Sequence, residues 1–413
     1  MRSRFIKSAT TIFAASALVV AGFASAAYPH GSHDDGRSNG RHHHHHDDGD
    51  NGNGNDGGAS APVVLTNGLN NPRQLALVDG KVLLIAEAGS GGPTCQGTGQ
   101  DQMCIGATGS ISGVLFPQYG TSRDHTQLVT NLISGAGPDG SFAVGSDGVA
   151  QRNLHKPIYI QETFAPPDVI PGGLPGDQVG KLLKARPFGT ATPFADITAF
   201  ENGDPDGHGF DSDPYAVVAR RHDFLVADAA GNDILRVDHE GNVSLFHLFP
   251  NVVNALTTAG QDPNAPVPGA DFVPTSLALG PHGDVYVGGL VGEVAGAGQV
   301  VKLDGETGDV KQVWDGFTTV TGVAVGPDCS LYVSQLFAPQ ANPITPDVNG
   351  VLTKVTRDGV HHDIDVPFPA GVAVDDSGNV FVSAWSIAPA AGLSNVPPGV
   401  TVDTSGQVWR LHF

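Results

Sequence analysis

Three carboxylates stand directly after apolar segments that have the composition of buried strands. Glu87 follows VLLIA, Glu162 follows IYIQ and Asp228 follows FLVA. If the three strands end at one place, the carboxylates converge there, and several hard oxygen donors are what Ca²⁺ requires. A cation held in this way polarises a carbonyl group and positions water for attack. One hypothesis is therefore a site for Ca²⁺ or another divalent cation in a hydrolase or lactonase.

The same carboxylates have a second interpretation that needs no metal. Buried carboxylates are commonly held by a cationic side chain and by backbone N–H groups, and Arg73 is available for this role. Arg73, Asp213 and Asp228 are also the side chains that we expect to contact a bound ligand, because each adjoins the start or the end of a predicted strand. Both interpretations stay open at the level of sequence.

A repeat supplies the elements that position these residues. The segment TSLALGPHGDVYV, which begins at Thr275, is an apolar run, a Gly-rich turn and an alternating second run, the pattern of a β-hairpin. Five further copies begin at Arg73, Ser141, Pro214, Thr321 and Ala370, the copy at Ser141 being degraded. Most copies continue with a third and a fourth strand-like segment. Four antiparallel strands per repeat are typical of a β-propeller blade.

The two ends of the domain predict how the ring closes. The last repeat ends at GQVWRLHF with no fourth strand, whereas residues 63–66 form a strand that no earlier hairpin uses. Placing this strand at the outside of the last blade removes exposed edges. We therefore predict an all-β chain, a six-bladed β-propeller of the NHL-like kind over residues 61–413, rather than an irregular β-sandwich.

The propeller prediction places two sets of residues near the channel axis, because the first strand of each blade lines the channel. The residues that follow the second strands are Gln161 and those at six equivalent positions: Glu87, Glu162, Asp228, Gly289, Gln335 and Trp385. The residues that precede or begin the first strands are 71–73, Asp139, 211–213, Thr275, Thr321 and Ala370. In the first of these sets, the carboxylates belong to the first three blades.

A third possible chemistry is that of a quinone-dependent sugar dehydrogenase, which is also built on six blades. It requires a histidine base and cationic contacts to an anionic cofactor. His155, His208 and His222 qualify by residue type, but they fall in a connecting segment, an insertion and a turn, and the chain has only 21 Lys and Arg. The sequence therefore disfavours this reaction.

The first sixty residues predict export. Arg2, Arg4 and Lys7 precede an apolar run that ends in the small residues 24–26, which is typical of a secretory signal peptide at 1–26. Residues 27–60 are rich in His, Asp, Gly and Asn and lack apolar side chains, so we expect disorder there. Within them, the imidazoles of His42, His43, His44, His45 and His46 are potential metal ligands, alongside two other interpretations, a solvated linker and an expression tag.

Charge and cysteine content narrow the partners and the compartment. A formal net charge of −21 disfavours nucleic acid and anionic membranes as partners and favours solubility. We expect a monomer, and the signal peptide places it in the periplasm or outside the cell. Cys95 and Cys104 flank a Gly-rich loop that closes easily, which predicts a disulfide in an oxidising compartment. Cys329 is left as a free thiol in a turn.

Several segments together resemble one family. NNPRQLALVDGKVLLIAEAGSGGPTCQ, MCIGATGSIS, DSDPYAVVARRHDFLVADAAGNDILRVDHEG and VPTSLALGPHGDVYVGGL resemble the ScyD/ScyE family of exported, NHL-like six-bladed propellers, over essentially all of residues 63–413. The chain departs from the family pattern at Asp213, where Asn is usual, and at Gly289, where Glu is common. The resemblance implies a propeller that binds an unknown protein or small-molecule ligand, with no established cofactor or reaction.

Overall fold

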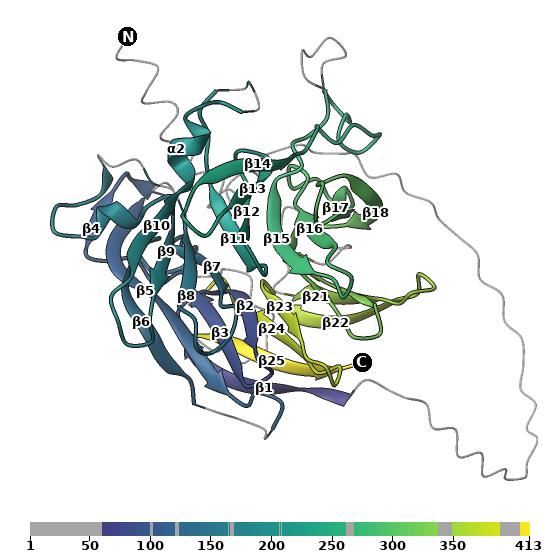
Figure 1. The fold of residues 1–413 in the computed structure, drawn as a ribbon, viewed down its shortest axis with the longest axis horizontal. Coiled ribbons are helices and arrows are strands. Elements are labelled where there is room, and N and C mark those ends of the chain that lie inside the picture. The colour runs from purple at the N-terminus through teal and green to yellow at the C-terminus, as the bar shows by residue number, and fades with distance from the viewer. Residues whose placement is uncertain are drawn as a thin grey trace, which may run out of the picture.

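The computed structural model describes residues 60–99, 102–119, 124–163, 165, 169–205, 207, 209–261, 268–337, 349–388 and 405–413 (Figure 1). The predicted signal peptide and the histidine-rich tract, including His42–His46, lie outside the described residues, as does His208. These predictions therefore stay predictions.

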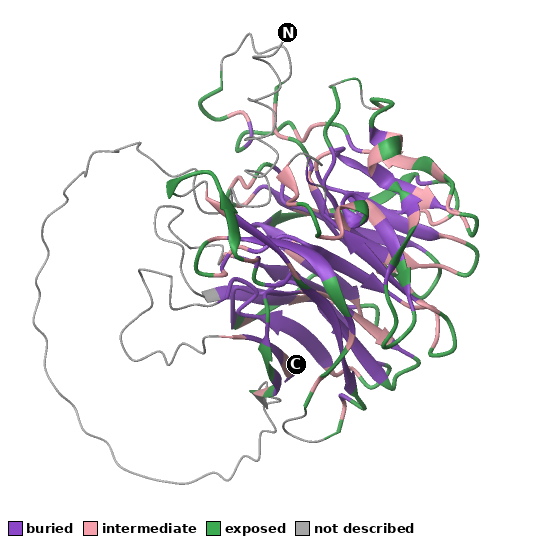
Figure 2. Ribbon diagram, turned by 90° about the vertical axis from the view of Figure 1, so that its left-hand side faces the viewer, coloured by how far each residue is buried: buried purple, intermediate pink, exposed green. Residues whose placement is uncertain are grey.

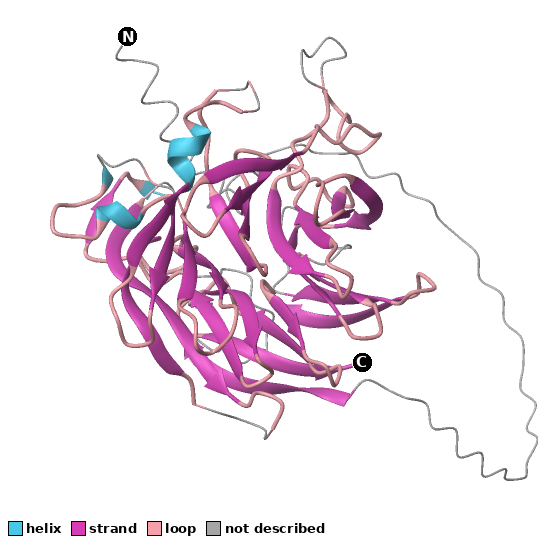
Figure 3. Ribbon diagram, in the orientation of Figure 1, coloured by secondary structure: helices cyan, strands magenta, loops and turns pink. Residues whose placement is uncertain are grey.

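Within the described residues, six antiparallel sheets are arranged as the blades of a propeller (Figures 1 and 3). Blade 1 consists of β2 (Pro72–Val78), β3 (Val82–Glu87), β5 (Met103–Leu115) and β6 (Thr126–Ala136), with the short β4 (Thr94–Gln96) also paired to β5. Blade 2 consists of β7 (Ser146–Ala150), β8 (Ile158–Glu162), β9 (Lys181–Ala185) and β10 (Thr192–Asp196). Blade 3 consists of β11 (Pro214–Ala219), β12 (Phe224–Asp228), β13 (Asp233–Val237) and β14 (Val243–Leu248).

The remaining blades repeat this order. Blade 4 consists of β15 (Pro274–Leu279), β16 (Val285–Gly289), β17 (Gly298–Leu303) and β18 (Val310–Phe317). Blade 5 consists of β19 (Val320–Val325), β20 (Leu331–Gln335), β21 (Asn349–Val355) and β22 (His361–Pro367). Blade 6 consists of β23 (Val372–Val374), β24 (Val380–Ala384), β25 (Gly406–His412) and β1 (Ser60–Leu69).

The predicted closure of the ring is confirmed. β1 pairs antiparallel with β25, with Val64 opposite Trp409 and Thr66 opposite Val408, so the first strand of the domain is the outer strand of the last blade. The prediction of an all-β, six-bladed propeller is confirmed with it. The pairing ties the two ends of the domain together and covers an edge of β25 that would otherwise be open to another chain.

The hydrophobic core is divided among the spaces between blades. Six buried clusters lie one between each pair of neighbouring blades, and Figure 2 shows the buried strands stacked through the ring. Between blades 2 and 3, for example, the rings of Tyr159 and Phe224 lie 4.2 Å apart. A strand packed on both faces must be apolar on both faces. This explains why β8 and β12 are buried at every position.

Two helical segments accompany blade 2, a 3₁₀ helix at Gly176–Gln178 and α2 at Ile197–Glu201. Asp196 caps α2 by accepting a hydrogen bond from the Ala199 backbone N–H at 3.0 Å. Within the described residues, no helix has the length and the apolar character that crossing a membrane would demand.

The cysteines are arranged as predicted. Cys95 in β4 and Cys104 in β5 are opposite each other and form a disulfide bond. Cys329 is a free, exposed thiol in the turn between β19 and β20. The disulfide therefore fastens the extra strand of blade 1 to its sheet.

Candidate functional site

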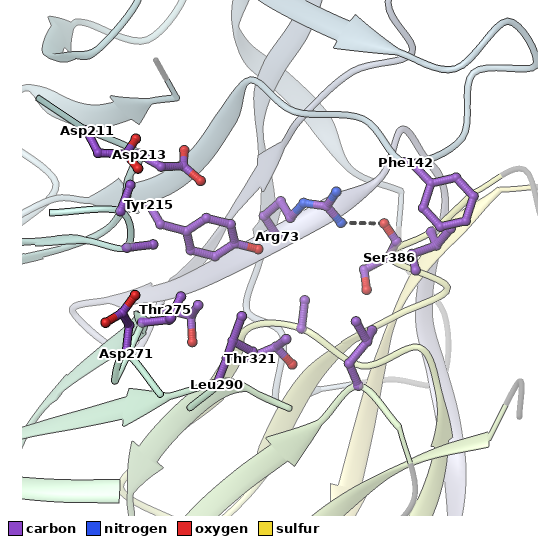
Figure 4. Close-up of a pocket in the computed structure, with 16 residues that line it drawn as sticks. Arg73, Phe142, Asp211, Asp213, Tyr215, Asp271, Thr275, Leu290, Thr321 and Ser386 are labelled. Carbon is purple, nitrogen blue, oxygen red and sulfur yellow. Dashed lines mark hydrogen bonds between the residues drawn. The ribbon is translucent and has the colours of Figure 1, made fainter. Parts of the chain in front are cut away.

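The first strands begin, and the second strands end, at one face of the ring, which we call the mouth. A cavity of about 210 Å³ lies there on the channel axis (Figure 4). Every blade, or the loop that leads into it, contributes to the wall. The wall combines charged, aromatic and apolar side chains, among them Arg73, Phe142, Asp211, Asp213, Tyr215, Asp271, Val273, Leu290, Leu336 and Ile387.

A repeated irregularity directs side chains from the first strands toward the axis. In blades 1 to 5 the pairing of the first and second strands shifts register near the mouth end. Such a β-bulge leaves a residue out of the ladder and re-aims its side chain. The residues at this position are Arg73, Asp147, Tyr215, Thr275 and Thr321, and Ala370 takes the equivalent place just before β23. All of them except Asp147 line the cavity.

Two members of this ring were missing from the sequence prediction. For blade 2 the sequence placed the hairpin at Ser141 and Asp139 at the axis, which is wrong, because the first strand is β7 and its bulge residue is Asp147. The correct register is visible in the shared Gly-Val-Ala of blades 2, 5 and 6, which begins at Gly148, Gly322 and Gly371. A Cβ on Gly148 would lie 2.8 Å from the Tyr215 carbonyl oxygen, so this close approach of two first strands requires glycine.

Tyr215 is the second residue that the sequence prediction missed. It had named the three residues before β11, at 211–213, but not the bulge residue itself. Tyr215 lines the cavity, and burial raises the pKa of its phenol above the usual value, so the group is neutral. An alignment of the six strand starts would have placed Tyr215 beside Thr275 and Thr321.

Arg73 has the appearance of an anion-binding residue, but three of its five N–H donors are engaged within the protein. Its Nε donates to Asp147 Oδ1 at 3.2 Å, and its two Nη atoms donate to the backbone oxygens of Ser386 and Ala143, each at 2.5 Å. Figure 4 shows the guanidinium extended toward Ser386. Burial raises the pKa of Asp147 to about 7, against the opposing effect of the Arg73 charge. The predicted ligand contact at Arg73 therefore lies at the cavity as a cross-blade tie between blades 1, 2 and 6.

Asp213 and Asp228, the other predicted ligand contacts, have different positions. Asp213 lines the cavity, and its carboxylate accepts a hydrogen bond from Thr163 Oγ1 at 2.6 Å. Asp228 is fully buried, does not line the cavity, and accepts from Ser212 Oγ at 2.7 Å and from the Asp213 backbone N–H at 2.6 Å. Burial raises the pKa of Asp228 to about 7. Asp228 thus holds the segment that carries Asp213.

The predicted metal ligands Glu87, Glu162 and Asp228 lie at the mouth ends of the second strands, as expected, but each is bonded within its own blade. Glu87 accepts from Ser110 Oγ at 3.0 Å, from Ser112 Oγ at 2.5 Å and from the Asn70 backbone N–H at 2.7 Å. Glu162 accepts from Ser146 Oγ at 2.5 Å, and burial raises its pKa well above the usual value.

Blade 5 offers a neutral counterpart of Glu87. Gln335 occupies the same position at the end of a second strand and accepts from the Thr318 backbone N–H at 2.7 Å, as Glu87 accepts from Asn70. Since an amide makes the bond that a carboxylate makes, the position does not need a charge. In the part of the chain that the structure describes, no three His, Cys, Asp or Glu side chains gather closely enough to hold a metal ion.

One side chain beside a second, smaller space on the axis ties three blades together. The Gln74 amide oxygen accepts from the backbone N–H groups of Val149 at 3.2 Å and Val217 at 3.1 Å, and its nitrogen donates to the Val217 oxygen at 2.8 Å. Gln74 lines this space, which measures about 20 Å³. Gln74 therefore fixes blades 1, 2 and 3 relative to one another where their first strands meet.

The described histidines of the dehydrogenase hypothesis lie away from this pocket. His155 is in the turn between β7 and β8, and His222 is in the turn between β11 and β12, both at the face of the ring opposite the mouth. The arrangement gives no histidine base to the described wall of the cavity.

Solved structures share this fold at low sequence identity. A putative oxidoreductase (glucose dehydrogenase) from Thermus thermophilus has a TM-score of 0.50 at 16% identity, over 86% of this chain and 100% of that chain. A streptogramin B lyase has a TM-score of 0.46 at 11% identity, over 85% and 96% of the two chains. A gluconolactonase from Xanthomonas campestris has a TM-score of 0.39 at 11% identity, over 86% and 98%.

These likenesses concern the fold, since identities in this range do not carry an activity from one propeller to another. No protein-family model matches the chain, and no curated protein matches it in sequence. The chain is a six-bladed β-propeller, a fold that it shares with the putative oxidoreductase from Thermus thermophilus.

Proposed function

We propose that the protein is an exported propeller of the ScyD/ScyE kind that binds a small molecule in the mouth of its channel and catalyses no reaction of its own. The observation that carries the proposal is the axial cavity of about 210 Å³, walled by the blades around the ring. A concave pocket with an apolar wall and a few polar groups is the usual form of a ligand site.

Rigidity of the wall favours binding. The bulge residues belong to the first strands of the blades. Two side chains of the first strand of blade 1, Arg73 and Gln74, bond to backbone atoms of other blades and so hold the blades in place. A pocket that keeps its shape without a ligand loses little entropy when the ligand enters.

Export is the second part of the proposal and rests on residues 1–26. The expected result is a chain secreted by the producing cell that begins at Ala27. N-terminal sequencing of the protein recovered outside the cytoplasm measures this directly, and an intact Met1 on the mature protein would contradict it.

The competing function is a Ca²⁺-dependent hydrolase or lactonase centred on Glu87, Glu162 and Asp228. It would require these carboxylates to leave the hydrogen bonds that each makes inside its own blade. The bond that Gln335 makes in place of Glu87 supports a structural role for the position instead.

The pocket can be tested by filling it. Leu290→Trp places a large ring at the mouth, where Leu290 lines the cavity, and Leu279→Trp places the same ring on the exposed far end of the same blade. In a fragment screen by ligand-observed NMR, we expect compounds that bind the wild type and the Leu279→Trp variant to lose binding to Leu290→Trp by at least ~10-fold. Equal binding to all three proteins would overturn the proposed site.

A further inference from the structure

The two sides of the pocket differ in chemistry. Figure 4 draws Asp211, Asp213 and Asp271 on one side of the cavity and Phe142 on the other. The rest of the wall includes the apolar side chains of Val273, Leu290, Leu336 and Ile387. An occupant that satisfies both sides must carry a polar group at one end and a hydrocarbon body at the other.

The sign of the charge on that polar group follows from the cations near the mouth. Arg73 donates to Asp147 and to two backbone oxygens, so three of its five N–H groups are directed to protein acceptors rather than to a ligand. Lys181 is the other described lysine or arginine in the mouth half of the ring, and it pairs with Asp196 at 2.7 Å. The remaining described lysines and arginines lie toward the opposite face, where the turns between first and second strands are.

The potential at the mouth is therefore negative, and this attracts cations. Asp211 and Asp271 are exposed at the rim, while Asp213 is buried in the wall. Tyr215 lies on the same side in Figure 4, and aromatic rings attract cations as well. An anionic ligand would meet these carboxylates, and the arginine on the described wall, Arg73, directs three of its five N–H groups to protein acceptors.

The smaller space on the axis provides a second observation that favours a polar occupant. Ser276 is 6% exposed, its hydroxyl has no hydrogen-bond partner among the described residues, and it lines this space. Tyr215, Thr275, Thr321 and Ala370 line both spaces, so the two lie next to each other on the axis. A buried hydroxyl without a partner is costly, and a polar group entering from the pocket would remove that cost.

The size limits the hydrocarbon body. A cavity of about 150 Å³ is enough to hold benzene, and this pocket measures about 210 Å³. A six-membered ring with a short substituent is therefore of a size that this volume can enclose.

From these observations we infer that the pocket selects a compact amphipathic cation, an organic ammonium whose charged group faces Asp211, Asp213 and Asp271 and whose ring-sized body packs against Val273, Leu290 and Leu336. This inference rests on the proposed binding function and specifies the ligand class for it.

The test compares three probes of nearly equal shape: benzylamine, benzyl alcohol and benzoate. We expect benzylamine to bind the full-length wild type with a Kd on the order of 1 mM. Benzyl alcohol is expected to bind ~10-fold more weakly, and benzoate is expected not to bind. Raising the NaCl concentration reduces the difference between the amine and the alcohol, because rim charges are screened. Isothermal titration and ligand-observed NMR measure these affinities.

Matched variants assign the effect to the rim. Asp271→Asn is expected to weaken benzylamine ~3- to 10-fold and to leave benzyl alcohol unchanged. Asp376→Asn, an exposed aspartate in the turn between β23 and β24, is expected to change neither. Equal affinity for the amine and the alcohol, or preference for benzoate, would overturn the inference and leave the proposed pocket standing. Binding of benzylamine that survives Leu290→Trp would count against the pocket itself.

Discussion

Blades 1 to 3 and blades 4 to 6, the two halves of the mouth, differ in the residue that ends the second strand. At the end of the second strand, blades 1 to 3 place Glu87, Glu162 and Asp228, whereas blades 4 to 6 place Gly289, Gln335 and Trp385. In the first half, the carboxylates accept hydrogen bonds from backbone N–H groups or serine hydroxyls close to the first strand.

In the second half, the same space is filled mainly by packing. A Cβ on Gly289 would lie 2.6 Å from the ring of Phe272, which occupies the place that a carboxylate takes in the other half. Trp385 packs against Phe368 with the ring centroids 6.1 Å apart, and Gln335 makes the amide version of the Glu87 bond. These carboxylates therefore hold the segments that lead into the first strands. The residues that face the cavity are the bulge residues and the loops next to them.

The largest expected effect comes from breaking the tie that only the charged half has. Arg73→Met leaves buried Asp147 and two backbone oxygens without their donor, and we expect a loss of about 3 kcal/mol of stability, measured by urea unfolding. Thr321→Val, at the equivalent bulge of blade 5, removes a hydrogen bond to the Pro369 oxygen and a longer one with Ser334 Oγ, and it is expected to cost about 1 kcal/mol.

Adding Asp147→Asn to Arg73→Met should recover part of the loss, because it removes the uncompensated carboxylate. If Arg73→Met and Thr321→Val destabilise the protein equally, the distinction between the two halves is wrong.

A smaller effect separates the structural interpretation from the metal interpretation of Glu87. Glu87→Ala leaves the Asn70 N–H and two serine hydroxyls without their acceptor and is expected to cost about 2 kcal/mol. Glu87→Gln keeps an acceptor, as Gln335 does in blade 5, and is expected to cost less than about 1 kcal/mol. Thermal unfolding of the two variants provides the measurement. A Glu87→Gln variant as unstable as Glu87→Ala would show that the charge itself is needed.

A separate effect is a dependence of stability on pH. Burial raises the pKa of Asp228 from 3.8 to about 7, so the folded protein binds this proton more tightly than the unfolded chain does. The contribution of protonated Asp228 to the free energy of unfolding is fully present below pH 3.8. It is lost as the pH rises toward 7, by at most about 1.4 kcal/mol for each pH unit.

Asp228→Asn removes this titration. Between pH 5 and pH 7, wild-type stability should fall more steeply than that of the variant in parallel urea titrations. Identical slopes would mean that Asp228 does not keep its proton in the folded state.

The architecture could be predicted from the sequence because the strand-and-turn pattern of a blade is local and occurs six times along the chain. Alternating strands and the unpaired segment at residues 63–66 predicted six blades and their closure, and both are confirmed. The proximity of Cys95 and Cys104 in a Gly-rich loop likewise predicted the disulfide.

The site was less predictable, for physical reasons that particular residues illustrate. Tyr215 and Asp147 reach the axis only because a bulge re-aims them, and a bulge is a property of strand pairing rather than of residue type. Phe142 and Ile387 come from loops, which carry no periodic pattern. The commitment of the Arg73 donors to backbone oxygens could not be foreseen from its charge.

A crystal structure of the full-length protein grown with both CaCl₂ and benzylamine tests the central claim most directly, because it displays the pocket and the carboxylates together. The account predicts benzylamine in the mouth, with its ring beside Leu290 and its nitrogen on the side of Asp271, and Glu87, Glu162 and Asp228 still bonded within their own blades. A Ca²⁺ ion coordinated jointly by Glu87, Glu162 and Asp228, with the mouth empty, would contradict it.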